Sequence, residues 1–388
     1  MLDTIVLRIA YPNFMVGNPN LFTPALKIVD RIPDFDYGRN RFQKFIQNSS
    51  LQDKKEGIYL PRLTVYQRFD DLKPTYDLHI EFSIPKLLFS NSVQEYDDTY
   101  FDRVINELKS RLSRMGIKIF ETNLRKAIVI KAHFGKNIPL THPLSVQDAI
   151  STLYKADIGR NKNINIRHFE NNGLALYFYA SYANIIFYDK LKDIEASKAR
   201  ALDKDKLKQE KLLVSSLSKE KRPEILRYEI RFTKQQSLDP FLSKVMGEQI
   251  KNISFEALFN SELWKKALLV SWSDIIKSPA SQLAFKLERP LEEVFDAMIT
   301  GLTTKKRKQA HSLNTALASL GLYALINQYG IRKTRDKIEK NWTGKSWNRL
   351  SDKIKVSATT LRSIPPSLAI SEIQSALEKF ERYDFKQD

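Results

Sequence analysis

The sequence predicts an α+β fold, in which an antiparallel sheet with covering helices is followed by an all-helical C-terminal domain. Up to about residue 235, short alternating runs of apolar and polar residues are mixed with amphipathic helical spacings. After Asp239 and Pro240 the apolar spacing is helical almost to the end. This change of period places a boundary near residue 240, with a sheet-containing catalytic domain at 1–240 and a helical, basic domain at 241–388.

The first half supplies the strands. Residues 1–10 alternate like a strand, whereas residues 11–57 carry Pro, Asn and Gly with little periodicity, which predicts loops. The runs 57–69 and 76–83 are short and alternating, so they predict paired strands joined by a hairpin over 70–74. Further strands are expected at 117–120, 127–134 and 226–232, and a β-hairpin is expected from 174–179 and 185–188.

Two helices are expected among these strands. Apolar residues recur every three or four positions over 98–115, which is the pattern of an amphipathic helix, and Gly116 ends it. A second helix is expected at 145–154. The segment 192–221 is rich in Lys, Glu and Asp and predicts an exposed helix or an excursion from the fold.

Composition indicates the partner. The chain has 388 residues and a formal net charge of +18, and such a surface attracts a polyanion, so nucleic acid is the expected partner. The alternative is a lysine-rich chain from an AT-rich genome with no such ligand. The chain has no cysteine, which excludes disulfides and thiolate chemistry.

The sequence contains neither a nucleotide-binding loop motif nor a membrane-spanning stretch. No Gly-rich phosphate loop of Walker or Rossmann type is present, so unwinding of DNA requires a separate helicase. No stretch approaches the roughly 20 apolar residues that a membrane span needs, so we expect a cytoplasmic protein without membrane contact.

Three residues are candidate metal ligands. His79 and Glu81 are two apart on a predicted strand, so both side chains face the same way. His133 lies near the end of another predicted strand. Three ligands from adjacent strands hold a divalent ion and leave positions open for a phosphate oxygen. The alternatives are an ordinary polar strand and a histidine that is satisfied by the backbone.

Tyr188 is the candidate nucleophile. It ends an apolar strand and is followed by Asp189 and Lys190. A tyrosine hydroxyl attacks a phosphodiester when a cation draws charge from the phosphate and favours phenolate, and Lys190 is placed to help. The alternative is a structural role, in which the Tyr188 ring packs against the fold and its hydroxyl lies in water. Three nearby tyrosines are rival candidates for the nucleophile: Tyr177, Tyr179 and Tyr182. Alternatively, these rings form a platform on which unpaired bases stack.

Basic residues supply candidate DNA contacts. Arg227, Glu229 and Arg231 are expected on one face of a strand. They either form an ion-pair ladder of little energetic value, or Glu229 binds the metal and the two arginines bind DNA phosphates. Residues 301–355 carry thirteen Lys or Arg against three Asp or Glu. A solvated face is the alternative to DNA contact there. The predicted DNA contacts are Arg227, Arg231, Lys136, Lys305, Lys306, Arg307, Lys308, Arg332, Lys333 and Arg335.

These segments, in this order, resemble the gene II replication initiators of filamentous phages and related phage and plasmid replication proteins. The similarity covers residues 1–235, and the helical half more loosely. The segments that carry it are 1–8, 79–88, 115–117, 133–138, 187–190 and 226–231.

The resemblance implies a rolling-circle nickase with an HUH-like fold. Tyr188 occupies the matching tyrosine position, and in that family the tyrosine keeps the 5′ end as a phosphotyrosine, frees a 3′ hydroxyl and later rejoins the ends. Two departures are His79-Ile80-Glu81, where many members have two histidines, and Lys131, where an acidic ligand is expected. The predicted ligands for Mg²⁺ or Mn²⁺ are His79, Glu81, His133 and Glu229.

The expected partners are single-stranded or supercoiled origin DNA, a host helicase and a host DNA polymerase, in the cytoplasm of a bacterial host. The oligomeric state stays open. Two other functions stay open as well: a plasmid mobilisation relaxase that uses the same chemistry, and a DNA-binding replication or copy-control protein without catalysis.

Overall fold

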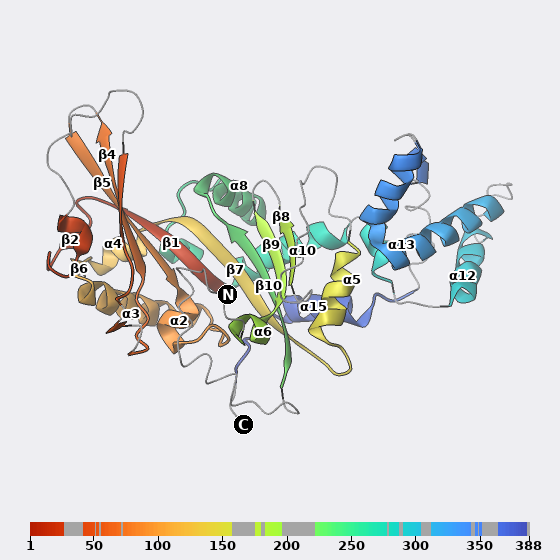
Figure 1. Ribbon diagram of the computed structural model, residues 1–388, viewed down its shortest axis with the longest axis horizontal. Coiled ribbons are helices and arrows are strands. Elements are labelled where there is room, and N and C mark those ends of the chain that lie inside the picture. The colour runs from red at the N-terminus through yellow and green to blue at the C-terminus, as the bar shows by residue number, and fades with distance from the viewer. Residues whose placement is uncertain are drawn as a thin grey trace.

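The computed structural model describes residues 1–26, 42–50, 52–53, 56–70, 73–156, 175–179, 183–195, 222–277, 279–286, 290–303, 312–342, 346–347, 349–350 and 364–385. Within these ranges the protein is α+β, as the sequence predicts. A large antiparallel sheet carries helices, and the described part of the chain after the last strand is helical (Figure 1).

Eight strands form the sheet, in the spatial order β3-β4-β5-β1-β7-β10-β9-β8. Their bounds are β1 (Leu2–Ala10), β3 (Phe42–Gln47), β4 (Arg62–Asp70), β5 (Lys73–Ser83), β7 (Ile128–Leu140), β8 (Ala175–Tyr179), β9 (Asn184–Asp189) and β10 (Glu224–Phe232). The N-terminal strand β1 lies between β5 and β7, and every pairing is antiparallel. The predicted pairings of β4 with β5 and of β8 with β9 are confirmed.

Two strand predictions need correction. β3 lies inside the segment that was expected to be loops; it is an edge strand paired with β4 alone, and its side chains are mostly polar or exposed. The strand expected at 117–120 is only β6 (Ile117–Lys118), which pairs with β2 (Met15–Val16) in a small separate sheet. β10 is the last strand in sequence but lies inside the sheet, between β7 and β9.

The helices of the first half agree with the apolar spacing. α3 (Phe101–Arg114) follows the 3₁₀ turn η2 (Asp98–Tyr100), and Gly116 follows it with φ 85°. Ser145 caps α5 (Val146–Tyr154) through a capping box with Asp148. The other helices with described bounds in this half are η1 (Thr23–Leu26), α2 (Ile84–Phe89), α4 (Glu121–Arg125) and α6 (Lys190–Glu195).

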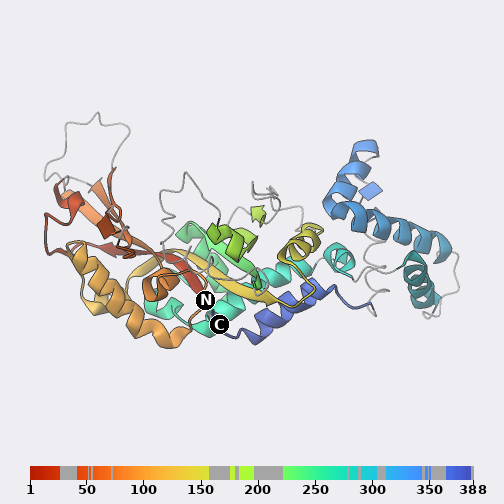
Figure 2. The same cartoon turned by 60° about the horizontal axis from the view of Figure 1, so that its bottom comes forward.

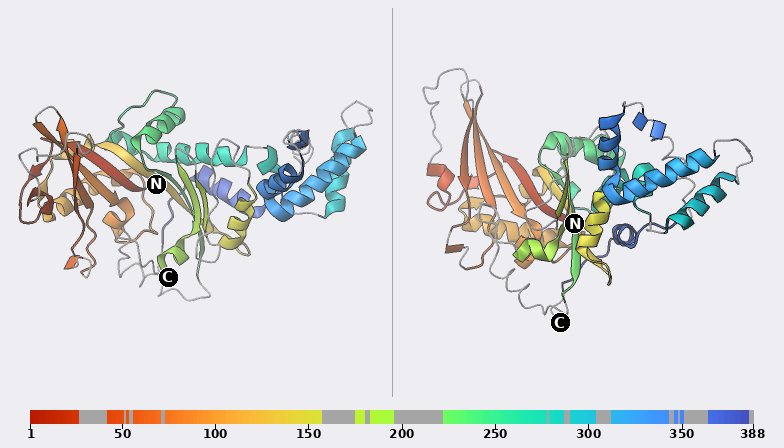
Figure 3. Two further views of the ribbon diagram at one scale, coloured as in Figure 1. Left: turned by 45° about the horizontal axis from the view of Figure 1, so that its top comes forward. Right: turned by 45° about the vertical axis from the view of Figure 1, so that its right-hand side comes forward.

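The second half is helical where it is described. α13 bends at Gly330, whose φ is 75°. The elements are α8 (Gln235–Met246), α9 (Phe255–Leu258), α10 (Ser261–Ile276), α11 (Pro279–Ala284), α12 (Leu291–Thr303), α13 (Ser312–Asn341) and α15 (Leu368–Lys379). Figure 3 shows α12 and α13 projecting away from the sheet. None of the described helices combines the length and the apolar character that a bilayer crossing requires.

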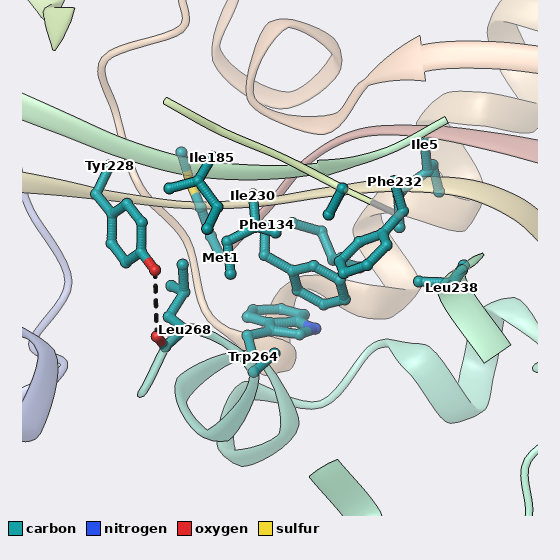
Figure 4. Packing of buried hydrophobic residues seen from close by; sticks show 14 of the residues in the cluster. Met1, Ile5, Phe134, Ile185, Tyr228, Ile230, Phe232, Leu238, Trp264 and Leu268 are labelled. Carbon is teal, nitrogen blue, oxygen red and sulfur yellow. Dashed lines mark hydrogen bonds between the residues drawn. The ribbon is translucent and has the colours of Figure 1, made fainter. Parts of the chain in front are cut away.

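The core lies between one face of the sheet and the helices. α8, α10 and α15 contact β7, and Figure 2 shows α3, α10 and α15 along the same side of the sheet. Phe134 and Phe232 face Trp264, which is fully buried (Figure 4). Each large apolar side chain buried in this way contributes roughly 1.5–3 kcal/mol. Residues on both sides of position 240 therefore share one core, and the division into two domains stays a prediction.

Candidate active site

The sheet face opposite to this core carries polar side chains. On β10, Ile230 and Phe232 enter the core, so Arg227, Glu229 and Arg231 point to the other side. The strand registers extend this surface, which we call the polar face. Its other members include Arg8 on β1, Tyr66 and Arg68 on β4, Asp77, His79 and Glu81 on β5, Lys131, His133 and Asn137 on β7, Tyr188 on β9 and Tyr177 on β8.

Tyr188 and Glu229 are joined at the centre of the β9–β10 pair. The Tyr188 hydroxyl donates to Oε1 of Glu229 over 2.7 Å, and Nε of Arg227 donates to the same oxygen over 3.0 Å. The other oxygen, Oε2, accepts from Nε and Nη2 of Arg231 at 2.8 and 2.6 Å. The structure thus confirms that the three β10 residues share a face. It also shows that both arginines are ion-paired to the glutamate.

Arg227 lies at the centre of a larger buried network. Its side chain is 0% exposed, and it donates to Oδ2 of Asp3 over 2.7 Å and to Oδ1 of Asn137 over 3.1 Å. A carboxylate oxygen of Glu95 lies 3.8 Å from the same guanidinium. The guanidinium of Arg227 is therefore surrounded by acceptors within the protein. Because it is also fully buried, Arg227 does not reach a DNA phosphate in this position.

Gly135 leaves the space that the Arg227 guanidinium fills. A Cβ atom at position 135 would lie 2.3 Å from Nη2 and 2.6 Å from Cζ of Arg227. We expect Gly135→Ala to lower the free energy of unfolding by about 1–3 kcal/mol, because the buried guanidinium has no free volume to enter. Urea unfolding measures this change.

The matched control for that variant is Gly321→Ala. A Cβ atom at Gly321, inside α13, meets open space. Alanine favours a helix interior over glycine by up to about 1 kcal/mol, so this variant should be as stable as the wild type or more stable. Equal stability of Gly135→Ala and the wild type would mean that the packing against Arg227 is not tight.

Lys136 does not belong to the polar face. It is buried, its ammonium forms an ion pair with Glu95, and it donates to the backbone carbonyl of Glu381 over 2.7 Å. The backbone N–H of Tyr383 donates to the same oxygen of Glu95, Oε2, over 3.0 Å. The segment after α15 therefore closes over this pair. The structure places Lys136 in the interior, where it does not contact DNA.

Lys190 lies beside the candidate nucleophile. It begins α6 directly after β9, it is buried, and its ammonium lies 5.8 Å from the ring centroid of Tyr188. Burial and the neighbouring Arg227 lower its pKa. Burial and the negative charge of Glu229 raise the pKa of Tyr188 well above 10, so its hydroxyl is protonated at neutral pH.

Glu229 is held in its ionised form. Burial alone would raise its pKa, but Arg231 and Arg227 outweigh this effect and keep the pKa well below 4.5. Tyr188 is 8% exposed, whereas the side chain of Arg231 is 26% exposed. Arg231 is therefore the group of this cluster that a ligand approaching from the polar face meets first.

The four predicted metal ligands are spread over the sheet. β1 lies between β5 and β7, and Val6 pairs with both Glu81 and Lys131, so Glu81 is about 10 Å from β7 across two strand spacings. Both oxygens of Glu229 are taken up by Tyr188 and the arginines. Within the part of the chain that the structure describes, no three His, Asp or Glu side chains are grouped for a metal ion. The predicted set does not fit one ion here, and the metal requirement stays a prediction.

The two histidines lie in different surroundings. Burial, with Arg8 and Arg68 next in effect, lowers the pKa of His79 to about 4. Burial and Arg231 lower the pKa of His133 to about 4. Both imidazoles are therefore neutral at pH 7. His133 pairs with Arg231 in register, which places it beside the Tyr188–Glu229 cluster rather than beside His79.

The remaining predicted contacts lie on the helical half. Lys305, Lys306, Arg307 and Lys308, like Tyr182 and most of the segment 192–221, lie outside the described residues. Arg332 and Lys333 are exposed on α13. The Lys333 ammonium lies 5.7 Å from the Tyr154 ring, and the Arg335 guanidinium lies 5.8 Å from the Trp347 ring.

No protein-family model, curated protein sequence or solved structure matches the chain.

Proposed function

We propose that this protein is a rolling-circle replication initiator with an HUH-like nickase domain, which cuts one strand of origin DNA by attack of Tyr188 on a phosphodiester. The observation that carries the proposal is the hydrogen bond of 2.7 Å between the Tyr188 hydroxyl and Glu229, whose other oxygen binds the partly exposed Arg231. A nucleophile, a proton acceptor and a phosphate-binding cation are thereby joined in one chain of contacts.

The reaction proceeds by exchange of one ester for another. The Tyr188 oxygen attacks phosphorus and its proton passes to Glu229, while the bond from phosphorus to the 3′ oxygen breaks. The 3′ oxygen takes a proton from water and leaves as a hydroxyl, and the 5′ phosphate stays on the tyrosine. Attack of a 3′ hydroxyl on this phosphotyrosine reverses the sequence and rejoins the strand.

Arg231 links substrate binding to activation of the tyrosine. While both arginines bind Glu229, its low pKa makes it a weak proton acceptor. A scissile phosphate that enters from the polar face competes with Glu229 for the exposed guanidinium of Arg231. Loss of that ion pair raises the pKa of Glu229, so the carboxylate becomes a stronger base when the phosphate is in place.

The broader features agree with this role. The net charge of +18 favours a nucleic-acid substrate. The helices α8 and α10 pack on the other face of the sheet, whereas α6 covers only the end of the polar face around Ile225. The 3′ hydroxyl would serve a host polymerase, with a host helicase, in the cytoplasm. Dependence on Mg²⁺ or Mn²⁺ is a separate part of the proposal, and no step above is routed through the ion.

The test is to map the covalent link. Protein is incubated with the supercoiled form of the genetic element that encodes it, with Mg²⁺, Mn²⁺ or EDTA, and the tryptic peptides are examined for attached nucleotides. We expect open circles and nucleotides on Tyr188. Tyr188→Phe should lose both and keep its DNA affinity, whereas Tyr177→Phe, which changes a tyrosine on the same face, should keep cleavage. Attachment to Tyr177 or Tyr179 would contradict the assignment of the nucleophile.

A second function is a DNA-binding replication or copy-control protein without catalysis. The burial of Tyr188 and the separation of the predicted ligands favour it. This protein would bind the origin without forming open circles under any of the three metal conditions, and Tyr188→Phe would have no effect on its binding.

A further inference from the structure

A second group of basic side chains lies on the polar face, away from Tyr188. It comprises four cations on four strands and two rings between them: Arg8, Lys44, Arg68, Lys131, Tyr66 and His79. We call this group the basic strip. Arg8 pairs in register with His79, and Lys44 pairs with Tyr66. The strip therefore crosses β3, β4, β5, β1 and β7 on one side of the sheet.

Three of the four cations of the strip have no ion pair with a carboxylate that the structure describes. Arg8, Lys44 and Lys131 form no ion pair with any described carboxylate, while Arg68, whose side chain is 50% exposed, lies 3.6 Å from Asp77. All four cations lie close enough to act electrostatically on His79. Like charges that converge raise the local potential, and this potential favours binding of a polyanion.

The two rings give the strip a second property. The ring centroids of Tyr66 and His79 are 4.4 Å apart at an interplanar angle of 45°, and the Lys44 ammonium lies 5.8 Å from the Tyr66 centroid. Nε2 of His79 is buried and has no hydrogen-bond partner among the described residues. Aromatic rings beside cations are the combination that binds unpaired bases together with their backbone.

We propose that the basic strip binds single-stranded DNA, with phosphates on Arg8, Lys44, Arg68 and Lys131 and a base against the rings of Tyr66 and His79. In a duplex the base faces are stacked on one another, so duplex DNA would reach the cations without using the rings. This binding goes beyond the proposed cleavage at Tyr188, since the strip holds none of the groups used there. Only its role in holding the cut strand rests on the proposed function.

The strip is continuous with the candidate active site. Lys131 and His133 lie two positions apart on β7 and face the same side, and His133 pairs with Arg231 on β10. A strand bound to the strip therefore has a path along one face of the sheet toward Arg231.

The experiment measures DNA affinity in full-length Tyr188→Phe protein, so that cleavage plays no part. The probes are a fluorescein-labelled oligothymidine of about 20 nucleotides, which is longer than the roughly 4–16 nucleotides that a single-strand site covers, and a duplex of equal length. Anisotropy gives Kd at several salt concentrations in EDTA, and thermal unfolding checks each variant.

Two kinds of variant separate the charges from the rings. Arg8→Gln combined with Lys131→Gln should weaken single-strand binding at least tenfold and reduce the salt slope by about 1.4, because each lost phosphate contact removes about 0.7 from the slope. Tyr66→Leu should weaken single-strand binding about tenfold with the slope unchanged and duplex binding little altered. Should the Arg8 variant fail to fold, Lys44→Gln on the edge strand β3 makes the same test.

The control is Lys251→Gln, which removes one exposed cation from the loop between α8 and α9. It should leave both the affinity and the slope unchanged. Strip variants that bind the oligothymidine as the parent does would overturn the proposal, as would equal losses for duplex and single strand with Tyr66→Leu. If the strip variants lose single-strand binding but the wild type never links DNA to a tyrosine, the strip proposal stands and the nickase proposal fails. If the wild type links DNA to Tyr188 but the strip variants bind normally, only the strip proposal fails.

Discussion

Arg227→Met should lower the free energy of unfolding by about 3–5 kcal/mol, because it leaves buried carboxylates without their cation. The Arg227 side chain is 0% exposed and lies in contact with Asp3, Glu229 and Asn137, with Glu95 3.8 Å away. Methionine has a similar length, so the variant removes charge and hydrogen bonds while leaving little empty volume. Urea unfolding at pH 7 measures the loss.

Arg231→Met is the matched control for this stability effect. It removes the second arginine on Glu229, but Arg227 remains bound and the Arg231 side chain is 26% exposed. We expect a loss well below that of Arg227→Met, since water replaces part of the interaction. If the two variants lost equal stability, the network would not be centred on Arg227.

Glu229→Gln should reduce the rate of nicking by about 10²–10⁴-fold without weakening the affinity for DNA. The amide keeps the size of the carboxylate and still accepts the hydrogen bond of Tyr188, but it does not take up the proton. Single-turnover cleavage, normalised to folded protein, measures the effect. Glu224→Gln is the control on the same strand, because Glu224 binds the backbone of Val146 instead.

The pH dependence of the wild type gives a further readout for Glu229. Its pKa in the folded protein lies well below 4.5, so lowering the pH from 7 to 5 leaves the carboxylate ionised. The second-order rate constant of nicking, measured at DNA concentrations below saturation, reports the protein before DNA binds and should therefore show no acid limb from this group in that range. A fall in rate centred near pH 6 that disappears in Glu229→Gln would show that the two arginines do not hold the carboxylate as described.

Local patterns predicted most strands and helices. Alternation found β4, β5, β9 and β10, and the three-and-four spacing found α3 and α5, because each pattern reports burial of one side of one element. β3 was missed because an edge strand with one paired neighbour buries little. The shared face of Arg227, Glu229 and Arg231 followed from the period of two, but the choice between an ion-pair ladder and ligands depends on burial, which the pattern does not contain.

Strand order was the main source of error in the candidate site. Bringing His79, Glu81 and His133 together requires β5 and β7 to be neighbours, whereas the N-terminal strand β1 is inserted between them. The same insertion brings Asp3 to Arg227, which is 224 positions away in the sequence. Contacts across such a separation leave no trace in local periodicity, so Asp3 and Glu95 could not be recognised as parts of the site.

The closing of residues 381–385 over Glu95 has a consequence for how the chain folds as it is made. The carbonyl of Glu381 binds Lys136 across 245 positions, and the N–H of Tyr383 binds Glu95 across 288. The sheet strands leave the ribosome long before these partners exist. Until then, Lys136 and Glu95 lack part of their hydrogen bonds. The sheet therefore reaches full stability only when α15 and the residues after it have been synthesised.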